Sequence, residues 1–162
     1  MSVLTHDHLL SILSYDERSG NFVWLINSGR ARIGNIAGNV HSGGYVVIIV
    51  DKKQYKAHRL AWFYVTGEWP RGRLDHKDNC GSNNRWDNLR PATHSQNMAN
   101  RKLNANNSCG HKGVVRRGSR YRAYINKDGK RYNLGTFSTA EEAAAVSWAK
   151  AQELHGSFAR RA

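Results

Sequence analysis

The chain has 162 residues, enough for one domain or two small ones, and its 40% of hydrophobic residues supports compact cores. It carries 25 Lys and Arg against 12 Asp and Glu, giving a net charge of +13 and a pI of about 10.2. This charge favours a polyanionic partner, most simply nucleic acid, over an undirected basic surface or an anionic membrane. Residues 1–70 carry +2, residues 71–105 carry +4, and residues 106–162 carry +7, so the basic excess is concentrated near the C-terminus.

The cysteines of the chain, Cys80 and Cys109, form no CxxC motif, which excludes a four-cysteine zinc site. A mixed site that adds His94 and His111 matches no known zinc spacing. Residues 1–7 lack the basic start and apolar stretch of a secretory signal, and no run approaches the length of a membrane span. We therefore expect an intracellular protein with reduced thiols that does not enter a membrane.

The first part of the chain alternates short helical and extended patterns. The expected elements are a helix over 6–14, a strand over 21–25, a hairpin over 45–57 and a helix over 58–65. Gly67 and Pro70 stop the second helix.

A Leu74-Asp75-His76 run then predicts a strand over 73–76. A polar loop and a second strand over 88–92 follow. Thr93 and Gln96 have the spacing of a helix capping box, which places Asn97 in the first helical turn. This ββα order lets one histidine, one carboxylate and one amide oxygen converge, as a single-metal phosphodiesterase requires.

These motifs resemble the HNH endonuclease family, in particular the phage and intron-encoded type without structural zinc. The matching segments are 74–79, 83–89 and 93–97, with typical flanks at 57–62 and 67–70, and the resemblance covers roughly residues 15–102. It implies a nuclease module over 1–102 with a ββα-metal core at about 72–102. In that module His76 is the general base, Asp75 and Asn97 hold the metal, and Asn88 supports catalysis by pinning the loop between the strands.

Each assignment has a plainer alternative. His76 could be an ordinary surface or core histidine, Asp75 a charge at a strand end, and Asn97 a solvent-facing helix residue. Asn100, one turn later, is the fallback ligand, and the resemblance places His58 in the scaffold. A carboxylate, an amide, waters and a phosphate form a hard oxygen shell, which suits one Mg²⁺ per active site, or Mn²⁺ as its substitute.

Beyond the nuclease module the pattern changes. Residues 103–110 are polar without periodicity, which predicts a linker. A second domain over 111–162 is expected to hold strands at 112–117, 121–127 and 130–137 and a helix at 140–154. The Asp128-Gly129 turn favours a hairpin, Ser138 or Thr139 caps the helix, and Gly156 ends it.

This second pattern resembles the plant ethylene-response-factor DNA-binding domain, through motifs at 113–114, 123–125, 134–137, 139–144 and 155–156. The resemblance and the alternation along the middle strand give the predicted DNA-binding residues: Arg117, Arg122, Tyr124, Asn126, Arg131 and Asn133. Val115, Tyr124 and Asn133 depart from the plant pattern at reading positions. A merely solvated sheet face is the alternative.

The sequence thus predicts an α+β fold, with a ββα-metal nuclease module and N-terminal β-hairpins followed by a small three-stranded antiparallel sheet plus helix. The expected activity is metal-dependent cleavage of double-stranded DNA by a monomer or a DNA-dependent dimer. A phage-encoded homing endonuclease, acting in the cytoplasm of a bacterial host, is the sharper form of this expectation. The alternatives are a catalytically inactive DNA-binding regulator, an RNA nuclease and a structural nucleic-acid-binding protein.

Overall fold

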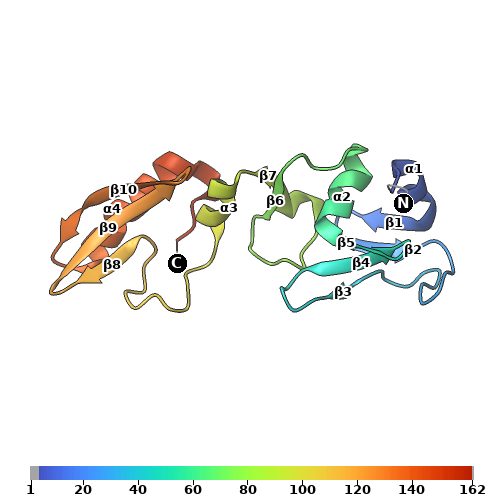
Figure 1. Ribbon diagram of the computed structural model, residues 1–162, viewed down its shortest axis with the longest axis horizontal. Helices are drawn as coiled ribbons and strands as arrows, with labels where there is room; N and C mark the ends of the chain where they lie inside the picture. The colour runs from blue at the N-terminus through green and yellow to red at the C-terminus, as the bar shows by residue number, and fades with distance from the viewer. Residues whose placement is uncertain (1–3, 162) are drawn as a thin grey trace. The chain divides into compact units, whose positions relative to one another are not determined.

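The computed structural model describes residues 4–161 and shows a mixed α+β fold with small sheets (Figure 1). The chain divides into two compact units, Met1–Pro91 and Ala92–Ala162. The helix that follows the predicted ββα strands therefore belongs to the second unit. A compact unit and a functional domain need not end at the same residue, so the predicted domain limits of 1–102, 103–110 and 111–162 stay predictions.

The first unit begins with a helix and a hairpin, continues with a small sheet and a second helix, and ends in a strand pair. Its elements are α1 (His6–Ile12), β1 (Leu13–Asp16), β2 (Asn21–Trp24), β3 (Asn39–Val40), β4 (Val46–Val50), β5 (Lys53–Lys56), α2 (Ala57–Thr66), β6 (Arg73–His76), the 3-10 turn η1 (Trp86–Asn88) and β7 (Leu89–Ala92). Strand β1 pairs with β2, strands β3, β4 and β5 form one sheet in that order, and β6 pairs with β7.

Several boundaries shift by one or two residues from the sequence prediction, and two of these shifts have a clear reason in the structure. The first helix ends at Ile12 instead of residue 14, because Leu13–Asp16 pairs with Asn21–Trp24 as a strand. The Tyr15 and Phe22 rings, 4.8 Å apart, hold this hairpin together. Asn88, predicted to start a strand, instead closes the short turn η1.

Helix α2 connects the core of the first unit to β6. Leu60 is fully buried in that core, and Leu89 of β7 packs into the same cluster. On the neighbouring face, the Arg59 guanidinium donates to the carbonyl oxygens of Gly72 and Pro70, at 3.0 and 3.2 Å. The loop that leads into β6 is therefore tied to the helix, while the partner strand is anchored by apolar packing.

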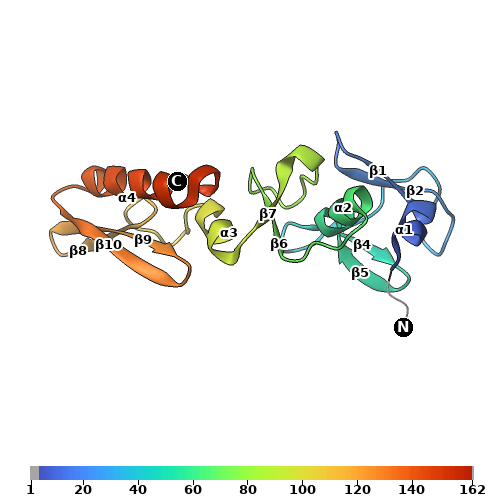
Figure 2. The ribbon, with the colours of Figure 1, turned by 90° about the horizontal axis from the view of Figure 1, so that it is seen from above.

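The second unit is a three-stranded sheet with a long helix on one face, as Figure 2 shows. Its elements are α3 (His94–Asn100), β8 (Val114–Arg117), β9 (Arg120–Lys127), β10 (Lys130–Phe137), α4 (Ala140–His155) and the 3-10 turn η2 (Gly156–Phe158). The strands run antiparallel in the order β10-β9-β8. Val114, Ala123 and Ala143 form the buried centre between sheet and helix.

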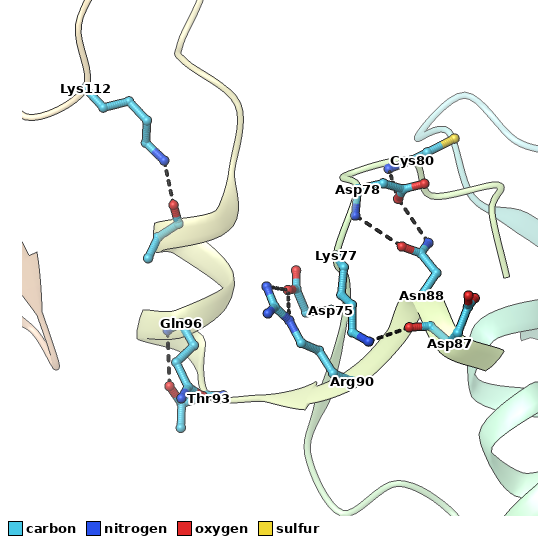
Figure 3. Close-up of polar contacts among 11 residues, drawn as sticks. Asp75, Lys77, Asp78, Cys80, Asp87, Asn88, Arg90, Thr93, Gln96 and Lys112 are labelled. Atoms are coloured by element: carbon cyan, nitrogen blue, oxygen red, sulfur yellow. Dashed lines mark hydrogen bonds and ion pairs between the residues drawn. The ribbon is translucent and has the colours of Figure 1, made fainter. Parts of the chain in front are cut away.

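Helix α3 is fastened to the second unit near both of its ends. The Lys112 ammonium donates to the carbonyl oxygens of Ala99 and Arg101, at 2.5 and 2.7 Å. Figure 3 shows Lys112 reaching toward this helix. At the other end, the Asp128 N–H donates to the Ser95 hydroxyl at 3.0 Å. Burial lowers the pKa of Lys112 to about 8, and two nearby guanidinium groups contribute to the same shift. The irregular segment between α3 and β8 contains the predicted linker.

Within residues 4–161, no helix combines the length and apolar character needed to cross a membrane.

Candidate functional site

Strand β6 ends in two buried polar residues. Asp75 is 4% exposed and His76 is 5% exposed. Neighbouring residues of a regular strand point to opposite faces, but β6 stops at His76, and the next N–H, of Lys77, donates to the Asn88 carbonyl oxygen at 2.9 Å. Both side chains are therefore buried at the end of the strand, and each has its own hydrogen-bond partner.

Asp75 forms a buried ion pair with Arg90 of β7. The guanidinium donates to Asp75 Oδ2 through Nε at 2.9 Å and through Nη2 at 2.8 Å (Figure 3). Both side chains are largely buried, so removal of either partner would leave a costly uncompensated charge. Sequence reasoning missed Arg90. The sequence did offer one signal for this ion pair. Arg90 lies two residues after Asn88, on the strand expected to pair with the strand of Asp75.

His76 is oriented by Asn84, which is 3% exposed. His76 Nε2 lies 3.3 Å from Asn84 Oδ1, and Asn84 Nδ2 donates to the Ser82 carbonyl oxygen at 3.2 Å. That second bond turns the Asn84 oxygen, which only accepts, toward the imidazole. In the neutral ring Nε2 therefore carries the hydrogen and Nδ1 the lone pair.

Burial is the main influence on the charge of His76, and it lowers the pKa of the imidazole. The Asn84 hydrogen bond and the Asp78 and Asp75 carboxylates oppose this shift without reversing it. The imidazole is accordingly neutral near pH 7, as a proton acceptor must be.

Asn88 closes the loop between β6 and β7. Its Oδ1 accepts from the Asp78 N–H at 3.2 Å, and its Nδ2 donates to the Asn83 carbonyl oxygen at 2.8 Å. Nδ2 also donates to Asp78 Oδ1 at 3.0 Å, and that oxygen accepts from the Cys80 N–H as well (Figure 3). The bonds to the Asp78 N–H and the Asn83 carbonyl are backbone bonds of the kind predicted for Asn88, while its part in catalysis stays a prediction.

The N-terminal hairpin supports the same loop from outside. The Tyr15 hydroxyl donates to the Asn84 carbonyl oxygen at 2.6 Å, and the Trp86 N–H donates to the Glu17 carbonyl oxygen at 3.0 Å. Gly20 has φ +77°, and a Cβ there would lie 2.4 Å from the Arg85 backbone nitrogen. Only glycine permits this approach, which brings the hairpin turn against the residue that follows Asn84.

A second buried histidine packs against His76. The His58 ring, on the first turn of α2, meets the His76 ring edge to face with centroids 4.9 Å apart. Burial, together with the charges of His76 and Lys56, lowers the pKa of His58 to about 3. His58 Nδ1 is buried and has no hydrogen-bond partner among residues 4–161. A neutral packing residue fits these facts, in line with the predicted scaffold role.

Asn97, the predicted second metal ligand, lies on α3 in the second unit and is half-buried. The helix begins as predicted, with a capping box. The Thr93 hydroxyl accepts from the Gln96 N–H, and the Gln96 side chain accepts from the Thr93 N–H (Figure 3). Asp75 belongs to the first unit, so shared metal binding by Asp75 and Asn97 stays a prediction. The fallback ligand Asn100 is buried at the end of α3.

The predicted DNA-binding residues share one face of the sheet in the second unit. Ala123 and Ile125 of β9 are buried on the α4 side, so the alternate residues of β9 point away from the helix. The register places Arg131 opposite Asn126 and Asn133 opposite Tyr124, and directly opposed residues point to the same side of a sheet. The residues on this shared face include Arg117, Arg120, Arg122, Tyr124, Asn126, Arg131 and Asn133.

Polar contacts order the side chains on this face. The Arg131 guanidinium lies 4.3 Å from the centre of the Tyr124 ring, and its Nε donates to Asn126 Oδ1 at 3.0 Å. Arg122 Nε is buried without a hydrogen-bond partner in the described part of the chain. The face is therefore cationic and contains a guanidinium held in a defined orientation.

A comparison with protein-family models assigns part of this site. The family described as HNH endonuclease matches residues 55–99. This segment is an HNH endonuclease domain. It runs from the end of β5 through α2, β6 and β7 into α3, and so contains Asp75, His76, Asn88 and Asn97. Searches of curated proteins and of solved structures found no match to the chain.

The HNH match places Asn84 and Arg90 inside the nuclease domain, beside the residues named from the sequence. Asn84 directly follows Asn83 in the sequence, and a tandem Asn-Asn does not reveal which amide faces the histidine. The match stops before β8, and the DNA-binding role of the second unit stays a prediction.

The buried His58 makes the stability of the first unit depend on pH. Its pKa is about 3 in the folded chain, against 6.5 for an unperturbed histidine, so the folded chain binds fewer protons between these values. The stabilisation is complete above pH 6.5 and is lost as the pH falls toward 3, by up to about 1.4 kcal/mol per pH unit. We expect His58→Leu to flatten the fall in urea-unfolding free energy between about pH 7 and about pH 5.

His76 also has a lowered pKa, so in His58→Leu the slope of the unfolding free energy against pH should become smaller without reaching zero. His41→Leu, which changes an exposed histidine of the same unit, is the control and should keep the wild-type slope. An unchanged slope in His58→Leu would contradict the buried neutral state.

Proposed function

We propose that the chain is a metal-dependent DNA endonuclease that hydrolyses phosphodiester bonds, with His76 as the general base. The observation that carries this proposal is the orientation of a buried imidazole within an HNH domain. Asn84 occupies His76 Nε2 and leaves the lone pair on Nδ1, while burial keeps the ring neutral. A general base must be held in a fixed orientation and must be unprotonated at the working pH, and His76 meets both conditions.

In the proposed mechanism, His76 Nδ1 takes a proton from a water molecule as the water oxygen attacks phosphorus. The bond from phosphorus to the 3′ oxygen then breaks. The positive charge that develops on the imidazole is stabilised by the Asp78 and Asp75 carboxylates, which already act on the pKa of His76. Asn88 and Asn84 hold the loop and the ring in place and do not exchange protons.

The residues present fit a hard divalent cation. Asp75 already pairs with a positive group, the Arg90 guanidinium, and an amide such as that of Asn97 offers a neutral oxygen. We propose that Asp75 and Asn97 hold one Mg²⁺, or Mn²⁺ in its place, per active site. When bound, the ion would neutralise charge on the phosphate and on the departing oxygen.

We further propose that the second unit binds double-stranded DNA through the sheet face that α4 leaves uncovered. Residues 106–162 carry +7 of the total charge, and the face presents arginine and asparagine side chains, which suit guanine and adenine edges. A sheet laid in the major groove would use this face. This assembly, a nuclease domain with its own targeting unit, suits a homing-type enzyme.

The role of His76 is tested by His76→Ala in a plasmid-cleavage assay. Loss of the general base should reduce the single-turnover rate at least about 10²-fold, while DNA affinity changes little. His8→Ala, which removes an exposed histidine, is the control and should cleave at the wild-type rate. Cleavage by His76→Ala at the wild-type rate would show that His76 is not the general base.

The metal requirement is tested by chelation and by ligand variants. Cleavage should stop in excess chelator and return with Mg²⁺ or Mn²⁺, because the proposed donors are oxygens. Asp75→Asn and Asn97→Ala should each raise the metal concentration needed for half-maximal cleavage. Asn106→Ala, an exposed asparagine between α3 and β8, should leave that concentration unchanged. Full activity in excess chelator would rule out the metal-dependent mechanism.

Base reading by the second unit is tested by Arg131→Ala. Loss of the side chain that is oriented by Tyr124 and Asn126 should cost roughly 1–3 kcal/mol on the preferred site and much less on random DNA. Lys150→Ala on α4 removes a charge from the opposite side of the unit. It should lower the affinity for the preferred site and for random DNA equally, or leave both affinities unchanged. Equal losses on both DNAs for Arg131→Ala would show that this face binds DNA without reading it.

A further inference from the structure

A lysine that the HNH resemblance does not assign lies beside the proposed general base. Lys56 is the last residue of β5 and the N-cap residue of α2, and its side chain makes no capping hydrogen bond. It is exposed, and it forms no ion pair with a carboxylate in the described part of the chain. Its ammonium instead lies 4.5 Å from the centre of the Tyr45 ring. An aromatic face can hold a cation in place without neutralising it.

Tyr45 connects that ammonium to the catalytic centre. Its ring centroid is 5.8 Å from that of His76 and 5.4 Å from that of His58. The β6–β7 loop also packs against Tyr45. A Cβ at Gly81 of this loop would lie 3.0 Å from the Tyr45 ring and 2.7 Å from the Gly44 carbonyl oxygen. The tyrosine is thus wedged between the two histidines and the loop that contains Asn84, and its ring position is fixed by the site.

The charge of Lys56 reaches both histidines. It contributes to the lowered pKa of His58 and to that of His76, which places the ammonium within electrostatic range of each ring. This lysine is held over an aromatic ring at the edge of a site expected to receive a polyanion. Such a placement keeps the positive charge available to a ligand.

We propose that Lys56, positioned by the Tyr45 ring, binds a non-bridging oxygen of the phosphate that is cleaved. This assignment rests on the proposed nuclease function and adds a phosphate-binding residue to it. The ammonium would hold the phosphate near His76 and stabilise the negative charge that grows on its oxygens as water attacks. Because that charge is larger in the transition state than in the bound substrate, Lys56 should matter more for the cleavage rate than for DNA affinity.

The proposal is tested with variants at two lysines of one hairpin. Lys56→Met removes the charge and keeps the length of the side chain, and Lys56→Arg keeps a charge. Lys52→Met is the matched control, because it removes the same charge from the turn at the far end of β5. Tyr45→Leu removes the aromatic support and Tyr45→Phe retains it. Circular dichroism melting confirms that each full-length variant is folded.

Two readouts are compared for each variant. The first is the single-turnover cleavage rate at saturating protein, with Mg²⁺ present. We expect Lys56→Met to lose about 10- to 100-fold in rate, Lys56→Arg to recover most of the loss, and Lys52→Met to match wild type. The cleavage rate of Tyr45→Leu should lie between those of Lys56→Met and wild type, and the rate of Tyr45→Phe should be close to that of wild type. A rate for Lys56→Met equal to that for Lys52→Met would overturn the proposal.

The second readout does not depend on cleavage. In the His76→Ala background, the salt dependence of DNA binding should lose about 0.9 in log–log slope for Lys56→Met and keep the parent slope for Lys52→Met. An unchanged slope for Lys56→Met would likewise overturn phosphate binding. Failure of the nuclease function itself is distinguishable, because the wild-type chain would then not cleave DNA at all while the salt slopes would still report whether Lys56 contacts phosphate.

Discussion

The nuclease site depends on one hydrogen bond, from the His76 imidazole to the Asn84 side chain. The bond is useful only if Asn84 is immobile, and three different parts of the first unit make it so. Ser82 fixes the amide, Tyr15 holds the backbone carbonyl, and the hairpin turn at Gly20 packs on the next peptide. The orientation of the His76 ring thus depends, through Asn84, on Tyr15, which lies 69 positions before that asparagine in the sequence. The N-terminal hairpin is therefore part of the support of this short motif.

Much of the fold could be predicted because its signals are local. The Asp75-His76 strand end, the Thr93 capping box and the hairpin of β4 and β5 all come from patterns within a few residues, and the structure contains each element. The end of the first helix could not be read in the same way. Leu13 continues the apolar spacing of the helix, and only pairing with a later segment places Leu13 and Ser14 in a strand.

The contacts of the site show the same contrast between local signals and signals that depend on distant parts of the chain. Asn88 was named because the motif marks it, whereas Arg90 and Asn84 act through partners that only the folded chain brings close. Lys56 is a further example, since its position depends on an aromatic ring eleven residues earlier that the β4–β5 hairpin brings alongside. In the second unit, alternation predicted which face of β9 is apolar, but the bulge between Asn133 and Gly135 and the stacking of Arg131 on Tyr124 were outside the reach of any pattern.

The fastening of α3 has a consequence for recombining such proteins. The segment between α3 and β8 looks like the natural junction at which one targeting unit could be exchanged for another. Yet α3 depends on Lys112 and on the turn at Asp128, both of which lie beyond that junction. A cut within 103–110 would replace the sheet and α4 and at the same time take away the supports of α3, which belongs to the same compact unit. An exchange at this junction would therefore require a donor that carries an equivalent lysine and hairpin turn.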